Sequence, residues 1–121
     1  KNKGTFVFGD WMVADGLSKK DKQKYVQPVL DGMLMPHAYS LDTYISWFTK
    51  HGYRIIYAED ITEPTKKTWD IASSIIKKPS LWKVAYQHGQ DLVHFLKCIK
   101  DMRAGMQKGF LKYGVVVAEK K

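Results

Sequence analysis

The sequence has a single cysteine, only two arginines and no long apolar segment. Because Cys98 has no second cysteine to pair with, an internal disulfide is excluded, which is compatible with a reducing compartment. No apolar run approaches the roughly 18–20 residues that cross a bilayer, and the apolar stretch near the start is too short for a secretory signal. We therefore expect an intracellular protein, cytoplasmic or organellar.

Arginine is scarce although the chain carries a formal net charge of +8. Only Arg54 and Arg103 offer the planar guanidinium that favours recognition of phosphates and bases. The lysines are spread along the chain, mostly opposite apolar stripes, as on solvated helix faces. The pattern does not favour nucleic-acid binding, and an acidic partner or a membrane surface fits the basic charge better.

Motifs for metals and nucleotides are missing too. The histidines show no pairing at i,i+4, and Cys98 has no cysteine partner, so no metal site is predicted. Neither a GxGxxG nor a Walker pattern is present, so the chain has no nucleotide-type cofactor motif of its own.

Three short apolar strands, separated by helical patterns, predict an α/β sheet. They cover residues 5–8, 53–58 and 115–118. Three strands are few for this class, and the first begins almost at residue 1 without a preceding Met, so we interpret the sequence as part of a longer protein.

About 50 residues separate the second and third strands, far more than a simple crossover needs, and we expect them to form a helical lid.

The helical patterns have recognisable starts and stops. Ser18 and Ser40 are suitable N-caps, and Gly52 is a suitable stop before the second strand. Pro28 lies inside the helical pattern that starts after Ser18, and it predicts a kink there or two short helices. Further helices are expected from Thr62 to just before Pro79, from residue 80 to 89, and from there to about residue 110.

Two polar pairs follow predicted strands, where α/β sheets place their ligands. Asp10-Trp11 follows the first strand and Glu59-Asp60 the second. Each pair has a structural alternative: Asp10 can cap the next loop, and acids before a helix complement its dipole. His37 and Tyr39, in a loop around Pro36, are candidates to point into a pocket or simply to lie in solvent.

The order of three segments resembles a known family. GDWMVAD (9–15), LDTYISWFTKHGYRIIYAEDIT (41–62) and FLKYGVVVAEKK (110–121) are similar to the C-terminal half of class I S-adenosylmethionine-dependent methyltransferases, above all the γ-tocopherol methyltransferase-like small-molecule enzymes. The resemblance covers essentially the whole chain, residues 1–121. It implies the last three strands of a Rossmann-like sheet, in the order 1-3-2 with the last strand antiparallel, and a lid formed by residues 63–110.

The resemblance also implies an activity: methyl transfer from S-adenosylmethionine to the N, O or C atom of a small acceptor. The family's glycine loop has no counterpart here, so the cofactor would be bound mainly by residues upstream, and this chain alone would be inactive. Asp10 matches the position of an acid near the acceptor, and the expected acceptor contacts are Trp11, His37, Tyr39, Met102 and Met106. The expected partners are the remainder of the domain or another copy of the chain. The competing hypothesis is a non-catalytic module that binds through its basic surface.

Overall fold

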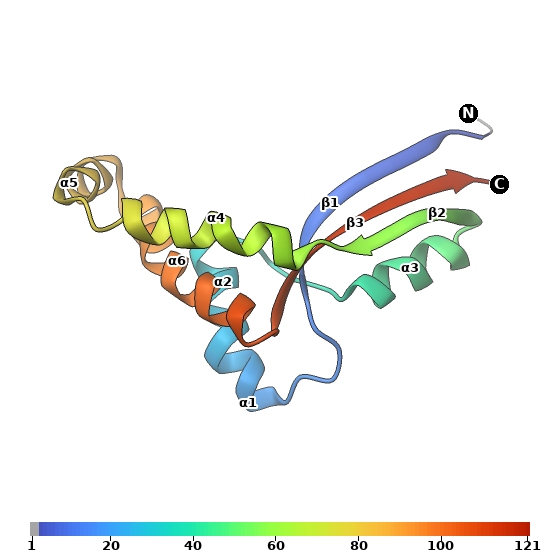
Figure 1. Cartoon of the computed structure of the whole chain (residues 1–121), viewed down its shortest axis with the longest axis horizontal. Coiled ribbons are helices and arrows are strands. Elements are labelled where there is room, and N and C mark those ends of the chain that lie inside the picture. Colours follow the sequence, from blue (N-terminus) through green and yellow to red (C-terminus); the bar gives the residue numbers. More distant parts are fainter. Residues whose placement is uncertain (1–2) are drawn as a thin grey trace.

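The computed structural model describes residues 3–121, which form a three-stranded sheet joined to a group of helices (Figure 1). No helix within these residues is long and apolar enough to cross a membrane. In chain order the elements are β1 (Thr5–Val13), α1 (Lys19–Asp21), the π-helical turn η1 (Lys22–Val26), α2 (Gln27–Gly32), α3 (Leu41–Lys50), β2 (Tyr53–Asp60), α4 (Thr62–Ile75), α5 (Pro79–His88), α6 (Gln90–Gln107) and β3 (Leu111–Lys120).

The sheet has the strand order β1-β3-β2, and β3 is antiparallel to both neighbours, so the predicted order is confirmed.

The strands are longer than the apolar runs suggested. Asp10 and Trp11 lie inside β1, opposite Gly114 and Tyr113, and not after its end as expected. The physical reason is that β3 begins as early as Leu111, so its first residues pair with the polar end of β1 and extend the ladder. Likewise, Glu59 and Asp60 are the last residues of β2.

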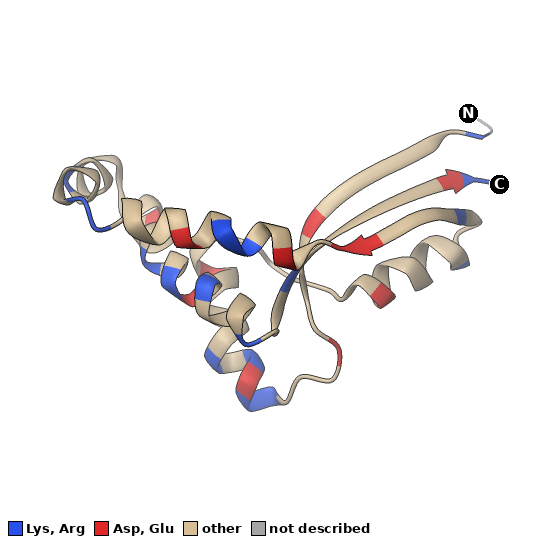
Figure 2. Cartoon of the chain, in the orientation of Figure 1, with Lys and Arg blue, Asp and Glu red and all other residues tan. Residues whose placement is uncertain are grey.

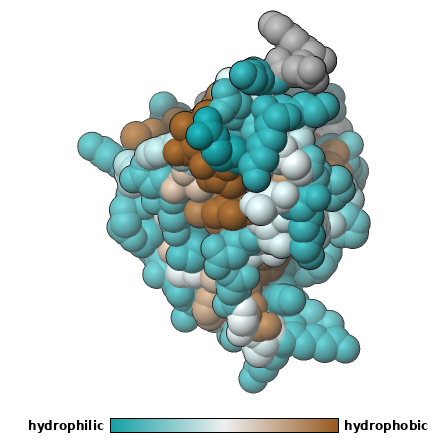
Figure 3. Space-filling model, turned by 90° about the vertical axis from the view of Figure 1, so that its right-hand side faces the viewer, coloured by the Kyte–Doolittle hydropathy of each residue, from teal (hydrophilic) through white to brown (hydrophobic). Residues whose placement is uncertain are grey.

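The two faces of the sheet differ in how they are covered. Helix α3 packs on one face, where the ring of Phe48 lies 5.5 Å from that of Phe6 and 5.6 Å from that of Phe8. On the other face, Val7 and Tyr57 remain 63% and 48% exposed. Viewed from the strand end, the surface includes exposed apolar side chains (Figure 3). One face of the sheet is therefore covered within this chain and the other is largely open.

Proline interrupts the first helical segment, as predicted. Pro28 cannot donate a backbone hydrogen bond, and the π-helical turn Lys22–Val26 lies directly before it. Ser18 caps α1 and Ser40 caps α3, each through its side-chain oxygen, which confirms both predicted N-caps.

The helices enclose their own apolar core. Helix α6 lies against α2, α4 and α5 and provides many of its buried side chains. The core consists of Val26, Val29, Trp69, Ile76, Ala85, Val93, Leu96, Ile99, Met102, Met106 and Leu111. Gly32 sits where α2 approaches α6 most tightly: a Cβ atom there would lie 2.3 Å from the Cβ of Cys98.

We expect Gly32→Ala to destabilise the protein, because the added methyl group would force α2 and α6 apart. Overpacking of this kind costs about 1–3 kcal/mol of unfolding free energy. Chemical denaturation of Gly32→Ala beside Gly4→Ala tests this, since a Cβ at Gly4 meets no atom of the described residues within 4 Å. Equal stability of the two variants would contradict the tight contact.

Candidate functional site

The carboxylate of Asp10 is held by two hydrogen bonds. One oxygen, Oδ1, accepts from the backbone N–H of Trp11 at 2.8 Å, and Oδ2 accepts from the hydroxyl of Tyr44 at 3.1 Å. Tyr44 comes from α3, 34 residues away in the sequence. Asp10 therefore joins the strand to the helix above it and does not cap the following loop.

Tyr44 is a firm hydrogen-bond donor in this pair. Its partial burial, followed by the negative charge and hydrogen bond of Asp10, raises the pKa of the phenol to about 12. Tyr44 consequently keeps its proton throughout the physiological pH range and donates it to Asp10. An ionised carboxylate oriented in this way can accept a hydrogen bond or hold a cation from a ligand.

The two loop residues predicted for the site lie in the same cluster. The ring of Tyr39 is 6.0 Å from that of Tyr44, and the ring of His37 is 5.9 Å from that of Tyr39. The backbone carbonyl of Tyr39 accepts a hydrogen bond from Val13 at 3.1 Å, which fixes the loop to the end of β1. Tyr39 also lines a cavity of about 260 Å³ beside the loop that follows β1. The structure thus brings Asp10, His37 and Tyr39 together through Tyr44.

Trp11 lies on the opposite face of the sheet, since neighbouring strand residues point to opposite faces. Its ring packs edge-on against Tyr113 at 4.6 Å and against Trp69 at 5.3 Å. Trp69 is only 6% exposed, and its buried indole N–H has no hydrogen-bond partner among residues 3–121. Gly9 leaves room for this cluster, because a Cβ there would lie 2.8 Å from the hydroxyl of Tyr113.

Met102 and Met106, the other predicted acceptor contacts, are buried in the helical core. Their side chains are 0% and 1% exposed and belong to the apolar cluster around α6. They lie in the core of the helices and not beside Asp10 in the hydrogen-bonded cluster. A role in acceptor binding stays a prediction for both.

Sequence reasoning missed three residues of these clusters: Tyr44, Trp69 and Tyr113. The residue types could have indicated a role in a polar cluster, because a buried Tyr or Trp usually needs a hydrogen-bond partner for its O–H or N–H. The partners themselves depend on tertiary contacts.

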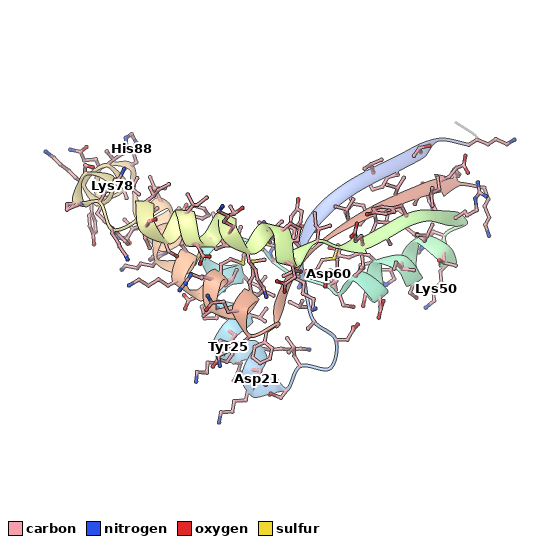
Figure 4. The ribbon with its side chains drawn as sticks, viewed as in Figure 1. Asp21, Tyr25, Lys50, Asp60, Lys78 and His88 are labelled. Carbon is pink, nitrogen blue, oxygen red and sulfur yellow. The ribbon has the colours of Figure 1, made fainter. Side chains whose placement is uncertain are left out.

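Asp60, from the second predicted pair, has a structural role at the junction of the sheet and α4 (Figure 4). Its Oδ1 accepts from the backbone N–H of Thr62 at 2.9 Å and also from the Thr62 hydroxyl, while Oδ2 accepts from Lys112 at 3.1 Å. Burial by itself raises the pKa of Asp60, but the hydrogen bonds from Thr62 and the charge of Lys112 outweigh it and lower the pKa. Thr62 in turn accepts from the N–H of Tyr113 at 3.1 Å, so this network ties β2, α4 and β3 together.

Within residues 3–121, no group of three or more His, Cys, Asp or Glu side chains is arranged to hold a metal ion. The candidate site is therefore described by its carboxylate and its aromatic rings.

Comparisons with known proteins identify the fold. No family model matches the sequence, and no curated protein matches it either. Among solved structures, a sarcosine dimethylglycine methyltransferase from Galdieria sulphuraria aligns over 100% of this chain and 43% of its own, with a TM-score of 0.76 and 20% identity. The mycolic acid cyclopropane synthase CmaA1, in complex with S-adenosylhomocysteine, aligns over 98% of this chain and 45% of its own, with a TM-score of 0.76 and 12% identity.

A third neighbour is the phosphoethanolamine N-methyltransferase 2 of Haemonchus contortus, also in complex with S-adenosylhomocysteine. It aligns over 99% of this chain and 27% of its own, with a TM-score of 0.73 and 15% identity. These neighbours are S-adenosylmethionine-dependent methyltransferases, and the chain shares the fold of part of them. The chain spans less than half the length of each of the three.

Within residues 3–121, the turns after β1 and β2 contain no glycine-rich loop. After β2 only Ile61 precedes α4, and the turn after β1 contains one glycine, Gly16. We therefore derive no step that involves the cofactor from this chain.

We expect Tyr44→Phe to lower the unfolding free energy at pH 7 by about 1 kcal/mol, the usual contribution of one hydrogen bond. The folded pKa lies above the ordinary value of 10, so this contribution is complete below pH 10 and is lost as the pH rises through about 12. The difference in stability between the wild type and Tyr44→Phe should therefore shrink between pH 10 and pH 12. Denaturant melts over this range test it, with Tyr86→Phe as control, because Tyr86 is 67% exposed. A constant difference across the range would rule out the Asp10–Tyr44 bond as its source.

Proposed function

We propose that this chain is the C-terminal, acceptor-side part of an S-adenosylmethionine-dependent methyltransferase that methylates an N, O or C atom of a small molecule. The observation that carries the proposal is the strand order β1-β3-β2 with an antiparallel central strand, combined with alignment of the whole chain to a methyltransferase at a TM-score of 0.76. Two of the neighbours bear the names of small amines, which supports a small acceptor. Placement in the γ-tocopherol methyltransferase-like group rests on the sequence resemblance.

In this proposal Asp10 orients the acceptor. Methyl transfer depends mainly on alignment of the reactants in a site from which water is excluded. Asp10 is suited to this task because Tyr44 and the Trp11 N–H fix both of its oxygens, while the carboxylate keeps lone pairs for an acceptor. His37 and Tyr39 are the nearest candidates for further acceptor contacts on the same side.

The helices within residues 63–110 are proposed as the lid over the acceptor. They comprise most of α4 and all of α5 and α6, and their shared core gives them the rigidity to close over a ligand as a unit. Trp11, Trp69 and Tyr113 lie where α4 meets the sheet, so the lid would contact the acceptor there. The cofactor is proposed to bind mainly to residues that precede this chain in the protein.

The alternative, a non-catalytic module that binds through its basic surface, is less well supported. Lys and Arg residues are distributed over several helices and are interspersed with acidic residues along the ribbon (Figure 2). A fold shared over the whole chain with methyltransferases is the more specific observation.

In the full-length enzyme, we expect Asp10→Ala to lower kcat more than it weakens cofactor binding. The loss is about 10²- to 10⁴-fold if Asp10 accepts the acceptor's proton, and smaller if it only orients the acceptor. Steady-state kinetics and calorimetric cofactor titration on the same variant separate the two effects. Asp42→Ala, an exposed acid on α3, is the matched control.

The melting temperature of Asp10→Ala distinguishes a purely structural role. Loss of the bond to Tyr44 alone would destabilise the protein while each folded molecule stayed fully active. That result would remove Asp10 from the candidate site.

We also propose that the open edge of β1 and the uncovered sheet face bind the remainder of the methyltransferase domain or, in its absence, another copy of the chain. The N–H of Val13 points out of the sheet to Tyr39, and alternate residues of an edge strand share this direction. Thr5, Val7 and Gly9 thus direct their backbone groups to an open edge. Such an edge, beside exposed Val7, is a template for association.

Light scattering on the 121-residue chain should therefore detect dimers or larger species as its concentration rises. Val7→Lys should shift the distribution towards monomer, because it places a charge on the apolar face. Ile71→Lys is the control, since Ile71 is also exposed but lies on α4. A monomer at all concentrations would contradict the proposal.

A further inference from the structure

A second cavity, separate from the Asp10 cluster, lies among the helices. It has a volume of about 720 Å³ and is bounded by α4, α5 and α6 and the turn that joins α4 to α5. Figure 1 shows α5 at the end of the molecule opposite to the strand ends, far from the termini. The volume lies within the range of small-molecule sites, roughly 300–1,000 Å³.

The lining of this cavity is positively charged. Lys77, Lys100 and Arg103 contribute cationic groups, and Asp70 contributes the single carboxylate. Arg103 Nε donates to Asp70 Oδ1 at 2.6 Å, so these two charges compensate each other. Neither Lys77 nor Lys100 takes part in an ion pair among residues 3–121. Two positive charges therefore remain without a counter-charge.

A buried hydroxyl and an aromatic ring complete the lining. The Oγ atom of Ser73 is buried and has no hydrogen-bond partner within the described chain. Buried polar atoms are rarely left unpaired, so the unpaired hydroxyl is an unusual feature beside this cavity. Trp82 is fixed by its indole N–H, which donates to the carbonyl of Ile76 at 2.5 Å, and its ring borders the cavity.

We propose that this cavity binds a soluble organic phosphomonoester that also carries a ring or another apolar group. A phosphomonoester has a charge of about −1.5 to −2 at neutral pH, which matches the two uncompensated lysines, whereas a carboxylate would match only one. Its oxygens accept hydrogen bonds from the ammonium groups of Lys77 and Lys100, and its apolar group packs against Trp82. The site is distinct from the Asp10 cluster, and its occupation does not depend on methyl transfer.

The direct test is a calorimetric titration of the protein with phenyl phosphate, beside inorganic phosphate and phenol. We expect saturable binding of phenyl phosphate with a dissociation constant below about 1 mM, and weaker binding of both other compounds. Lys77→Gln combined with Lys100→Gln should weaken binding at least about tenfold, through loss of two charge-assisted hydrogen bonds. Lys19→Gln with Lys20→Gln is the matched control, because these exposed lysines lie on α1.

The substitution Asp70→Asn should change the affinity for phenyl phosphate in the opposite direction. It removes the only acid of the lining and releases Arg103, so we expect tighter binding of phenyl phosphate, by about threefold or more. The proposal is overturned if phenyl phosphate does not bind saturably, or if the α1 lysine variant loses as much affinity as the cavity variant. It is also overturned if the protein sediments with phosphatidic acid vesicles without binding phenyl phosphate, since the ligand would then be a lipid surface.

Discussion

The pairing of β3 with strands on both sides is the constraint on which the rest of the structure depends. Val116 and Ala118 of this strand are completely buried beneath the α3 side of the sheet. Gly114 is required there because a Cβ atom would lie 2.6 Å from the sulfur of Met12 in the neighbouring strand. Since β3 directly follows α6, the same strand brings the helical core back to the sheet. The positions of Asp10 and Trp11 follow from this register.

The register also places Asp10 and Trp11, with the aromatic side chains around each of them, on opposite faces of the sheet. Asp10 lies on the side that α3 covers, where Tyr44 reaches it, and Trp11 lies on the side that meets α4. Two neighbouring residues thus contribute to different surfaces of the sheet. A ligand held by Asp10 and one packed against Trp11 would therefore approach from opposite sides of the sheet.

Local signals in the sequence predicted local structure well. The caps Ser18 and Ser40 and the interruption near Pro28 act within a few residues, and the structure confirms them. The strand order was available only from the family resemblance, because apolar runs do not specify which strands pair. The end of β1 was misplaced for a related reason: Asp10 is polar, and only its pairing with Gly114 makes it part of a strand. The bond from Tyr44 to Asp10 joins residues 34 positions apart and leaves no trace in sequence spacing.

Charge contributes less to holding this fold than to what its surfaces can bind. The side chains of Arg103 and Asp70 are 45% and 55% exposed, and exposed ion pairs of this kind stabilise a protein by at most about 1 kcal/mol. Full burial of one large apolar side chain contributes about 1.5–3 kcal/mol, so the uncovered sheet face has far more to gain from a partner than any ion pair supplies. A weak, exposed pair is also easily rearranged. The Arg103–Asp70 pair therefore contributes far less to the stability of the fold than the buried core around α6.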